Sequence, residues 1–405
     1  MVKVAILGFG VVGSGVAEVL TRNGGPIAEK TAEEIALKYI LDVRDFAESP
    51  YAGKFVKDFS VIEQDPEVEI VVETIGGATA ALDFTRRALA AGKSVVSSNK
   101  ELVAQYGHEL LELAQANGVS YLFEASVGGG IPILRPLSQC LAANRISEVR
   151  GILNGTTNYI LTRMIRAGLS FEAALAEAQE KGYAERDPSA DVDGIDACRK
   201  ICILADIAFG KHVYPKDVPA QGIRDVTLAD VRYAESAGMK IKLLGRARKL
   251  PDGRVMAFVA PHLVANSDPI SGVEDVFNAI TVRGDAIGDV MFYGRGAGKL
   301  PTASAVVADV MDAARNRRSR KYLHWATGET GYTVGPETLE SRWFVRLADD
   351  GEGLAGATPL TRPEQPAGET GFLTQAMTQA ELEKRLAGRA VQSVLRVLDE
   401  SADLT

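Results

Sequence analysis

Three glycines near the amino terminus restrict the fold of this chain more than any other feature. Gly8, Gly10 and Gly13 fit the pattern G-x-G-x-x-G, directly after the apolar run 2–7 and at the start of a helical pattern. In that setting the first glycine permits a tight turn, the second lets the backbone approach a pyrophosphate, and the third lets helix and strand pack closely. The helix amino terminus adds a positive pole for the anion. The motif predicts a dinucleotide-binding loop that consists of Gly8, Phe9, Gly10, Val11, Val12 and Gly13.

Strand and helix patterns alternate over the amino-terminal third of the chain. Alternation of this kind is typical of an α/β fold with a doubly wound parallel sheet. The expected strands are 2–7, 39–43, 70–75, 94–98 and 120–123, and the expected helices are 14–20, 80–91 and 101–117. We therefore predict a Rossmann-type domain over residues 1–127, to which a helix at about 301–320 returns.

The pattern changes after residue 128. The expected strands there are 149–153, 242–248, 255–259 and 279–283, and the long expected helices are 156–167 and 194–209. This mixture predicts an α+β domain over residues 128–300. Beyond residue 325 the chain is rich in Gly, Pro and Thr, and only one strand (342–347) and one helix (379–386) are clear, which predicts a small α+β tail over residues 336–405.

Charge and cysteine content exclude several classes of protein. The net charge of −8 argues against a partner that is nucleic acid, which requires a basic face. We interpret one basic run as a solvated helix end; its members are Arg315, Arg317, Arg318, Arg320 and Lys321. Three cysteines are too few and odd in number for a disulfide framework, so a cytoplasmic location is expected. No apolar stretch is long enough for a membrane helix, and no membrane partner is expected.

The cofactor remains open between NADP and NAD. An acid at the end of the second strand binds the ribose hydroxyls of NAD, whereas an arginine accommodates the 2′-phosphate of NADP. Residues 42–45 contain both, as Asp42 and Arg44. We favour NADP slightly because of Arg44.

The densest polar segment is 185–200. Asp196 and Lys200 stand four residues apart and share one face of an expected helix. Apolar residues at neighbouring angles place Lys200 at the edge of a buried cleft, where a lysine can donate a proton during reduction of a carbonyl. The alternative is a surface helical pair. A calcium loop is excluded, because Lys200 occupies the position where glutamate is required.

Three further motifs are ambiguous when taken singly. Residues 97–100 (Ser-Ser-Asn-Lys) lie at a strand end that faces the ligand crevice of a doubly wound sheet, although a lone lysine there is usually solvated. Residues 154–158 (Asn-Gly-Thr-Thr-Asn) form a capped turn before a helix, which is most often structural. Residues 127–132 (Val-Gly-Gly-Gly-Ile-Pro) present carbonyls to a cation or form a hinge.

Taken together, these motifs resemble the homoserine dehydrogenases in order and spacing over roughly residues 1–325. The stretches 124–134 and 294–298 match as well. The resemblance implies reduction of L-aspartate 4-semialdehyde to L-homoserine with NADPH or NADH, in threonine and methionine biosynthesis. It also implies a homodimer or homotetramer formed through the middle domain, which is then catalytic and dimerising. Because no aspartokinase-like segment precedes the fingerprint, we expect the monofunctional form.

The resemblance further implies roles for individual residues. Lys200 corresponds to the proton donor, with Asp196 and Lys100 supporting hydride transfer and substrate position. The implied substrate contacts are Glu185, which holds the amino group, with Asp191, Gly155 and Thr156. The implied cofactor contacts beyond the fingerprint are Arg44, Thr74, Ser97, Lys100, Gly182 and Gly298. A sodium or potassium ion is implied at Glu124, Val127, Gly129 and Ile131, bound largely by carbonyl oxygens.

Two rivals share this architecture. Aspartate-semialdehyde dehydrogenase needs a cysteine nucleophile in a cofactor-facing motif, whereas Cys140, Cys198 and Cys202 lie in helical patterns. A nucleotide-sensing regulator needs no Lys100, Asp196 or Lys200. In the tail, residues 341–347 resemble the first strand of an ACT domain. Glycines and prolines between residues 351 and 366 oppose the helix that should follow, so we expect a degenerate ACT-like region without strong inhibition by L-threonine.

Overall fold

The amino-terminal part of the chain is a parallel sheet covered on both faces. The computed structural model describes residues 1–317, 323–349 and 354–398. Its first sheet has the strand order β3-β2-β1-β4-β5-β6, which is the doubly wound order of dinucleotide-binding domains. The strands are β1 (Val2–Leu7), β2 (Ile35–Leu41), β3 (Phe55–Val56), β4 (Val68–Glu73), β5 (Ser94–Ser97) and β6 (Tyr121–Leu122). The predicted α/β fold class is confirmed.

Helices on the two faces of this sheet form separate cores. The helices are α1 (Val11–Arg22), α2 (Gly24–Thr31), α3 (Ser60–Glu63), α4 (Thr79–Ala90) and α5 (Lys100–Ala116). Val4 and Ile6 face α1, whereas Ala5 and Leu7 join the cluster of α4 and α5. Because both faces are covered, β1 is an almost uninterrupted apolar run rather than an alternating one.

A helix from far along the chain returns to this domain. α11 (Lys299–Arg315) packs against α1 on the face opposite α4 and α5. The approach is close at Gly15, where a Cβ atom would lie 2.9 Å from the carbonyl oxygen of Lys299. At the end of α11, Arg315 donates to the carbonyl of Lys30 and Arg317 pairs with Glu69 at 2.8 Å. Arg315 is exposed at the helix end, as predicted, whereas Arg317 is only partly exposed and bound by carboxylates of the sheet domain, so the interpretation as solvated is wrong for Arg317. Arg318, Arg320 and Lys321 lie outside the described residues.

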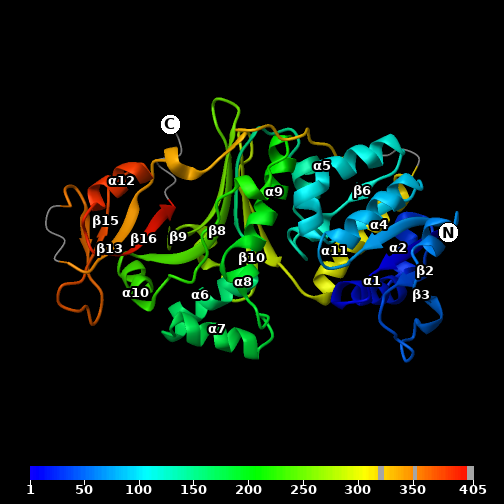
Figure 1. The fold of residues 1–405 in the computed structure, drawn as a ribbon, viewed down its shortest axis with the longest axis horizontal. Coiled ribbons are helices and arrows are strands. Elements are labelled where there is room, and N and C mark those ends of the chain that lie inside the picture. Colours follow the sequence, from blue (N-terminus) through cyan, green and yellow to red (C-terminus); the bar gives the residue numbers. More distant parts are fainter. Residues whose placement is uncertain (318–322, 350–353, 399–405) are drawn as a thin grey trace.

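The rest of the chain builds a second, ten-stranded mixed sheet with the order β11-β10-β7-β8-β9-β16-β13-β15-β14, and β12 pairs with β9. Its middle-domain strands are β7 (Ile146–Ile152), β8 (Met239–Lys249), β9 (Val255–Ala265), β10 (Phe277–Gly284) and β11 (Gly288–Arg295). The helices beside it are α6 (Gly155–Ala167), α7 (Phe171–Glu180), α8 (Ser189–Val192), α9 (Ile195–Phe209) and α10 (Leu228–Ser236). Buried side chains of α6, α9 and α10 join those of β8 in one core. Figure 1 shows the middle-domain strands between the nucleotide-binding domain and the tail strands that continue the same sheet.

The tail contains more strand than predicted. It comprises β12 (Thr333–Val334), β13 (Trp343–Leu347), β14 (Thr358–Leu360), β15 (Thr370–Leu373), α12 (Gln379–Leu386) and β16 (Val391–Leu398). The sequence pattern made only one of these strands clear, at 342–347. No helix occurs between β13 and β14 among the described residues, although 350–353 lie outside them. β16 runs parallel to β9, with Arg396 opposite His262, so the tail extends the middle sheet rather than forming a separate one.

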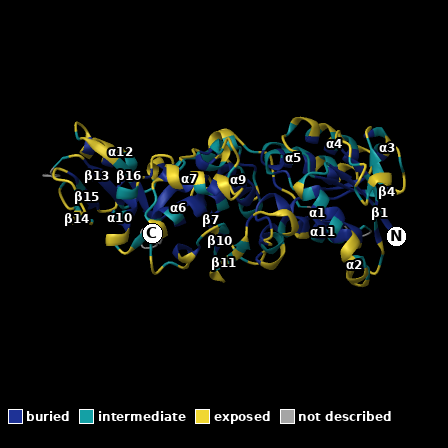
Figure 2. Ribbon diagram, turned by 90° about the horizontal axis from the view of Figure 1, so that it is seen from below, coloured by how far each residue is buried: buried dark blue, intermediate teal, exposed yellow. Residues whose placement is uncertain are grey.

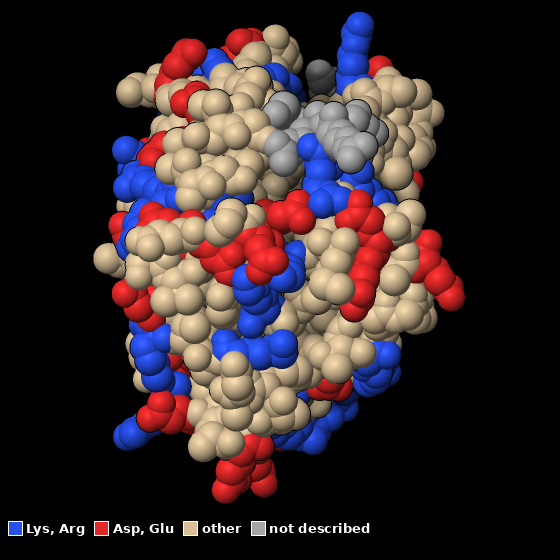
Figure 3. Space-filling model, turned by 90° about the vertical axis from the view of Figure 1, so that its right-hand side faces the viewer, with Lys and Arg blue, Asp and Glu red and all other residues tan. Residues whose placement is uncertain are grey.

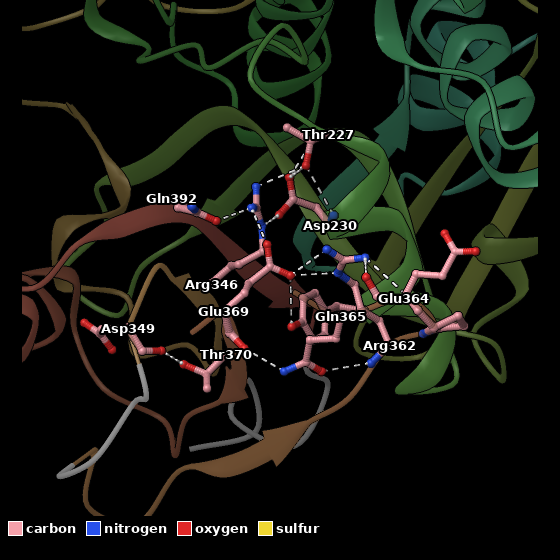
Figure 4. A network of polar contacts seen from close by, with 12 residues as sticks. Thr227, Asp230, Arg346, Asp349, Arg362, Glu364, Gln365, Glu369, Thr370 and Gln392 are labelled. Atoms are coloured by element: carbon pink, nitrogen blue, oxygen red, sulfur yellow. Dashed lines mark hydrogen bonds and ion pairs between the residues drawn. The ribbon is translucent and has the colours of Figure 1, made fainter. Parts of the chain in front are cut away.

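A buried polar network joins the tail to α10 (Figure 4). Arg346 of β13 donates to Asp230 at 2.8 Å and to Thr227 at 3.1 Å, both at the start of α10. Its other terminal nitrogen reaches Glu369, which also accepts from Arg362 at 2.8 Å. Phe344 packs on Tyr233 of α10, with ring centroids 5.7 Å apart. Charged groups thus form part of the junction between tail and middle domain.

Short helical turns connect the main elements, and their bounds are η1 (Ala52–Lys54), η2 (Glu124–Ser126), η3 (Pro136–Cys140), η4 (Pro215–Asp217), η5 (Pro269–Gly272) and η6 (Pro336–Thr338). Figure 2 shows buried residues along the strands of both sheets and exposed residues on the outer helices. At the end of the nucleotide-binding domain, acidic and basic side chains are interspersed (Figure 3). Within the described ranges, no helix combines the length and apolar character needed to cross a bilayer.

Candidate active site

The glycine fingerprint forms a tight loop between β1 and α1. Gly8 has φ +89°, and a Cβ on Gly13 would lie only 1.9 Å from the carbonyl oxygen of Gly8. The hydroxyl of Thr74 lies 2.9 Å from the carbonyl oxygens of Leu7 and Gly8 and supports the loop from β4. α1 begins after Gly10 without a side-chain cap, so no cap side chain accepts from its first N–H groups, and a helix start of this kind suits an anion such as a pyrophosphate.

Asp42 and Arg44 lie together at the end of β2. The Asp42 carboxylate accepts from the Phe9 N–H at 2.7 Å and from the Arg44 guanidinium at 2.9 Å. The guanidinium lowers the pKa of Asp42, with the N–H donors of Arg44 and Phe9 acting in the same direction. Arg44 itself stays more than half exposed, 5.1 Å from the centre of the Phe46 ring. The two residues that could distinguish NAD from NADP, Asp42 and Arg44, therefore lie side by side next to the fingerprint.

Lys200, Asp196 and Lys100 come together between the two domains. The ammonium of Lys200 donates to Asp196 Oδ2 and to the carbonyl oxygen of Leu153, both at 2.8 Å. From the other domain, the Lys100 ammonium lies 2.5 Å from Asp196 Oδ1. The side chains of Asp196 and Lys200 are 4% and 9% exposed, which excludes the alternative of a surface helical pair.

The charges of this cluster shift one another. Burial would raise the pKa of Asp196, but the Lys200 and Lys100 ammonium groups outweigh it and lower that pKa. Burial lowers the pKa of Lys200, and Asp196 only partly opposes the change. A lysine whose pKa is lowered exchanges its proton more readily near neutral pH than an exposed one, as acid–base catalysis requires.

Asn154 belongs to the same cluster, although the sequence indicated only a capping role for it. Its side-chain amide donates to Asp191 at 2.7 Å and to Asp196 at 2.9 Å. Its oxygen accepts from the Thr157 N–H and caps α6, so the helix start and the acidic pair are fixed together. Burial, followed by the charge of Asp196, raises the pKa of Asp191. The motif had signalled the residue, but its contacts across the fold were not visible in the sequence.

The remaining predicted substrate residues lie at different depths. Gly155 follows Asn154 directly, and a Cβ there would lie 2.8 Å from the carbonyl oxygen of Val276. Thr156 is buried and donates to the Tyr183 carbonyl at 2.7 Å, which fastens the loop after α7 beside the cluster. Glu185 and Gly182 are exposed on that loop. In the described chain, Glu185 is held through its carbonyl by Gln179, and its carboxylate is not brought against Lys200 or Asp191.

The predicted cation loop has its acidic side chain already engaged. The Glu124 carboxylate accepts three backbone N–H groups, from Ile133 at 2.6 Å and from Leu134 and Arg135 at 2.8 Å. Gly129 has φ +56° and packs against the backbone of Gly296. Among described residues there is no group of three acidic, His or Cys side chains that could hold a metal. The Glu124 carboxylate is therefore bound by the backbone N–H groups of residues 133–135, and Val127 and Ile131 are buried.

Ser97 and Gly298 occupy contrasting positions. Ser97 is fully buried and its hydroxyl donates to Glu73 at 2.6 Å, so this hydroxyl is hydrogen-bonded within the protein core. Gly298 has φ +123° and precedes α11 next to the fingerprint helix. None of the three cysteines lies in the Lys200 cluster: the Cys198 sulfur is 3.7 Å from the carbonyls of Pro215 and Val218, Cys202 is buried, and Cys140 is exposed. The site therefore lacks the nucleophile of the first rival.

Comparisons with known proteins agree over most of the chain. The family model "Homoserine dehydrogenase" matches residues 132–311, and "Homoserine dehydrogenase, NAD binding domain" matches residues 8–124. A homoserine dehydrogenase of Synechocystis is 45% identical over 317 residues, which are 77% of this chain and 73% of that one. A homoserine dehydrogenase of Pseudomonas aeruginosa is 39% identical over 393 residues, 95% of this chain and 89% of that one.

Solved structures agree as well. A homoserine dehydrogenase from Thiobacillus denitrificans superposes with a TM-score of 0.90 at 36% identity and covers 98% of both chains. A hyperthermophilic archaeal homoserine dehydrogenase in complex with NADPH matches with a TM-score of 0.66 at 29% identity, over 77% of this chain and 97% of that one.

Proposed function

The chain belongs to the homoserine dehydrogenase family, and we propose from the geometry of its site how its own residues perform the reaction. The enzyme is an NAD(P)-dependent oxidoreductase that interconverts L-aspartate 4-semialdehyde and L-homoserine in amino-acid biosynthesis. The nicotinamide of the bound cofactor supplies or accepts the hydride. The remaining tasks, holding the substrate and moving the proton, fall to the chain.

Lys200 is the proton donor to the forming alkoxide. An ammonium group has three N–H donors, and Asp196 and the Leu153 carbonyl take two of those on Lys200. The third is available to the substrate oxygen. In the reverse direction the neutral amine accepts the hydroxyl proton, which the lowered pKa of Lys200 favours. The observation that carries this assignment is the burial of the Lys200–Asp196 pair at a junction of two domains.

Lys100 and Asp196 set the position of that proton. Asp196 lies between the two ammonium groups, so it orients Lys200 and ties it to the start of α5. Lys100 is 40% exposed, which leaves it accessible to substrate and to the nicotinamide end of the cofactor. Asp191, Gly155 and Thr156 line the substrate side. Glu185 binds the substrate ammonium in this proposal. Only its negative charge supports that role, because Glu185 is exposed to solvent in the structure.

NADP is the preferred cofactor in this proposal. An exposed guanidinium beside the ribose position favours a 2′-phosphate. Against it, Asp42 engages Arg44 and offers the carboxylate that NAD uses. The related archaeal enzyme is described in complex with NADPH. A kinetic comparison of NADP⁺ and NAD⁺ with L-homoserine tests the preference, and equal kcat/KM values would refute it.

The proposal also includes a bound monovalent cation, a homo-oligomeric assembly and a cytoplasmic location. The positive φ of Gly129 and the engaged carboxylate of Glu124 support a sodium or potassium ion bound by backbone carbonyls. The partly exposed Met291 and Tyr293 on edge strand β11 support assembly of a homodimer or homotetramer through the middle domain. Unpaired cysteines support a reducing cytoplasm.

A further inference from the structure

A buried carboxyl group lies at the carboxyl end of β4, next to the strand end from which Lys100 reaches Asp196. Glu73 is the last residue of β4 and is fully buried. Its Oε2 accepts from the Ser97 hydroxyl at 2.6 Å and its Oε1 accepts from the Ile75 N–H at 2.7 Å. Within the described chain no Lys or Arg pairs with it; Tyr121 of β6 is the titratable group that faces it. Burial raises the pKa of Glu73 to about 7, and its hydrogen bonds limit the rise.

Ser97 passes this contact on to the start of α5. Its oxygen accepts from the Asn99 N–H at 3.0 Å. The Asn99 side chain accepts from the Leu102 N–H at 3.1 Å, which caps the helix. Its amide donates to the carbonyls of Ile75 at 3.0 Å and Gly77 at 2.7 Å. Two segments, 75–77 after β4 and 97–100 at the end of β5, are thus joined to each other and to Glu73.

Such a network is unfavourable as a simple filler of the core. A buried carboxyl loses its hydration, and an apolar side chain of similar volume often stabilises a site of this kind at least as well. A fully satisfied polar network does restrict the geometry of the groups it joins. Glu73 therefore contributes a defined loop geometry that a leucine at the same place cannot supply.

The geometry that matters is that of Lys100. Lys100 is the first residue of α5 and directly follows Asn99. Its ammonium crosses from the nucleotide-binding domain to Asp196 in the middle domain, at 2.5 Å. A shift of the helix start by a fraction of an ångström moves this ammonium relative to Asp196. Because Asp196 also binds Lys200, the shift disturbs the position of the Lys200 ammonium as well.

We propose that Glu73 is a positioning residue for the reaction, which acts through Ser97 and Asn99 to hold Lys100 against Asp196. The inference rests on the proposed role of Lys100. It assigns a function to a carboxyl group that touches neither substrate nor cofactor.

A double-mutant cycle tests the proposal. Misplacement of a catalytic group by about 1 Å costs on the order of 10²-fold in rate, so Glu73→Leu should lower kcat for L-homoserine by about 10- to 100-fold. In a Lys100→Ala background the same change should have almost no further effect, because its route of action is gone. Glu73→Gln should recover most of kcat, since its amide oxygen still accepts from Ile75 and its amide nitrogen reaches Ser97.

Controls separate positioning from stability. The melting temperature and NADPH fluorescence report folding and cofactor binding for each variant, and Ser97→Ala replaces Glu73→Leu if the latter does not fold. Asp206→Asn changes another buried carboxyl, bonded to His212 and the Val213 N–H; any effect it has on kcat should multiply with that of Lys100→Ala. If the losses of kcat in Glu73→Leu and Lys100→Ala multiply in the double variant, the inference about Glu73 is overturned while the proposed function stands. A Lys100→Ala enzyme with unchanged kcat would overturn the role of Lys100 and the inference with it.

Discussion

The carboxylate of Asp196 accepts a 2.8 Å hydrogen bond from the ammonium of Lys200, one helical turn further along α9. Pairs at this spacing usually lie on the surface and contribute a few tenths of a kcal/mol. Here both side chains are buried, and a second ammonium, from Lys100, approaches the same carboxylate. The pair therefore places a buried proton-exchanging group at the junction of the two domains, and its variants should change the reaction rate and its pH dependence.

Lys200→Ala should lower kcat for L-homoserine by about 10²- to 10⁴-fold, the usual size of a lost acid–base group. The affinity for NADPH, followed by fluorescence, should change little because the fingerprint lies elsewhere. Lys200→Arg is the matched control: it keeps the positive charge beside Asp196 but cannot release a proton near neutral pH, so it should remain slow. A near-normal kcat in Lys200→Ala would refute the role of proton donor.

Asp196→Asn should move the pH profile of L-homoserine oxidation to lower pH. Burial lowers the pKa of Lys200 and the Asp196 carboxylate raises it again, so removal of that charge lowers the pKa further. Oxidation needs Lys200 in its neutral form, and its rate therefore rises as the pH passes upward through this pKa. Measurement of kcat/KM against pH should place the rise earlier in Asp196→Asn than in the parent. Asp191→Asn, which removes a weaker influence, should shift it less, and an upward shift in Asp196→Asn would contradict the assignment.

Arg44→Ala should weaken NADP(H) binding several-fold and leave NAD(H) binding nearly unchanged. Only NADP(H) carries the 2′-phosphate that the guanidinium would bind, and the Asp42 carboxylate stays held by the Phe9 N–H when Arg44 is removed. Dissociation constants for the two reduced cofactors provide the comparison. Equal losses for both would mean that Arg44 supports the loop after β2 and does not read the phosphate.

Arg346→Ala should destabilise the protein by about 3–5 kcal/mol, the typical cost of removing one partner of a buried ion pair. Asp230 is fully buried and loses its cation, while Glu369 keeps Arg362. Urea unfolding of Arg346→Ala and of Arg166→Ala makes the comparison. Arg166 pairs with Glu274 but is 62% exposed, so its loss should cost under about 1 kcal/mol. Similar losses in both variants would show that the junction in Figure 4 contributes no more than a surface pair.

L-Threonine at millimolar concentration should leave L-homoserine oxidation largely uninhibited. The first helix of an ACT module is missing from the described residues between β13 and β14, and the tail is continuous with the middle sheet through β16. A titration of initial rates is sufficient. Cooperative inhibition that disappears on deletion of residues 336–405, in a variant that still binds NADPH, would show a regulatory tail.

The main elements of the nucleotide-binding domain followed from local patterns. β1 has the predicted bounds, as does α12 in the tail, because apolar periodicity and helix caps are properties of neighbouring residues. β2 was placed too late: its predicted end at Val43 is 93% exposed, while charged Lys38 lies inside the strand and pairs with Asp65. In the tail, β14 to β16 were missed because they are short or rich in polar residues and depend on their neighbours for pairing.

The sequence by itself determined the dinucleotide loop, the doubly wound order of strand and helix, and the spacing that puts Asp196 and Lys200 on one helical face. Only the tertiary structure decided that Lys100 meets Asp196, that Asn154 joins both acids, and that Glu73 lies under the start of α5. It also left Glu185 in solvent, away from the cluster. The physical reason is range. Turns, caps and amphipathic faces arise within about one or two helical turns, whereas a buried charge acquires its partners and its pKa from segments that only the packed domains bring together.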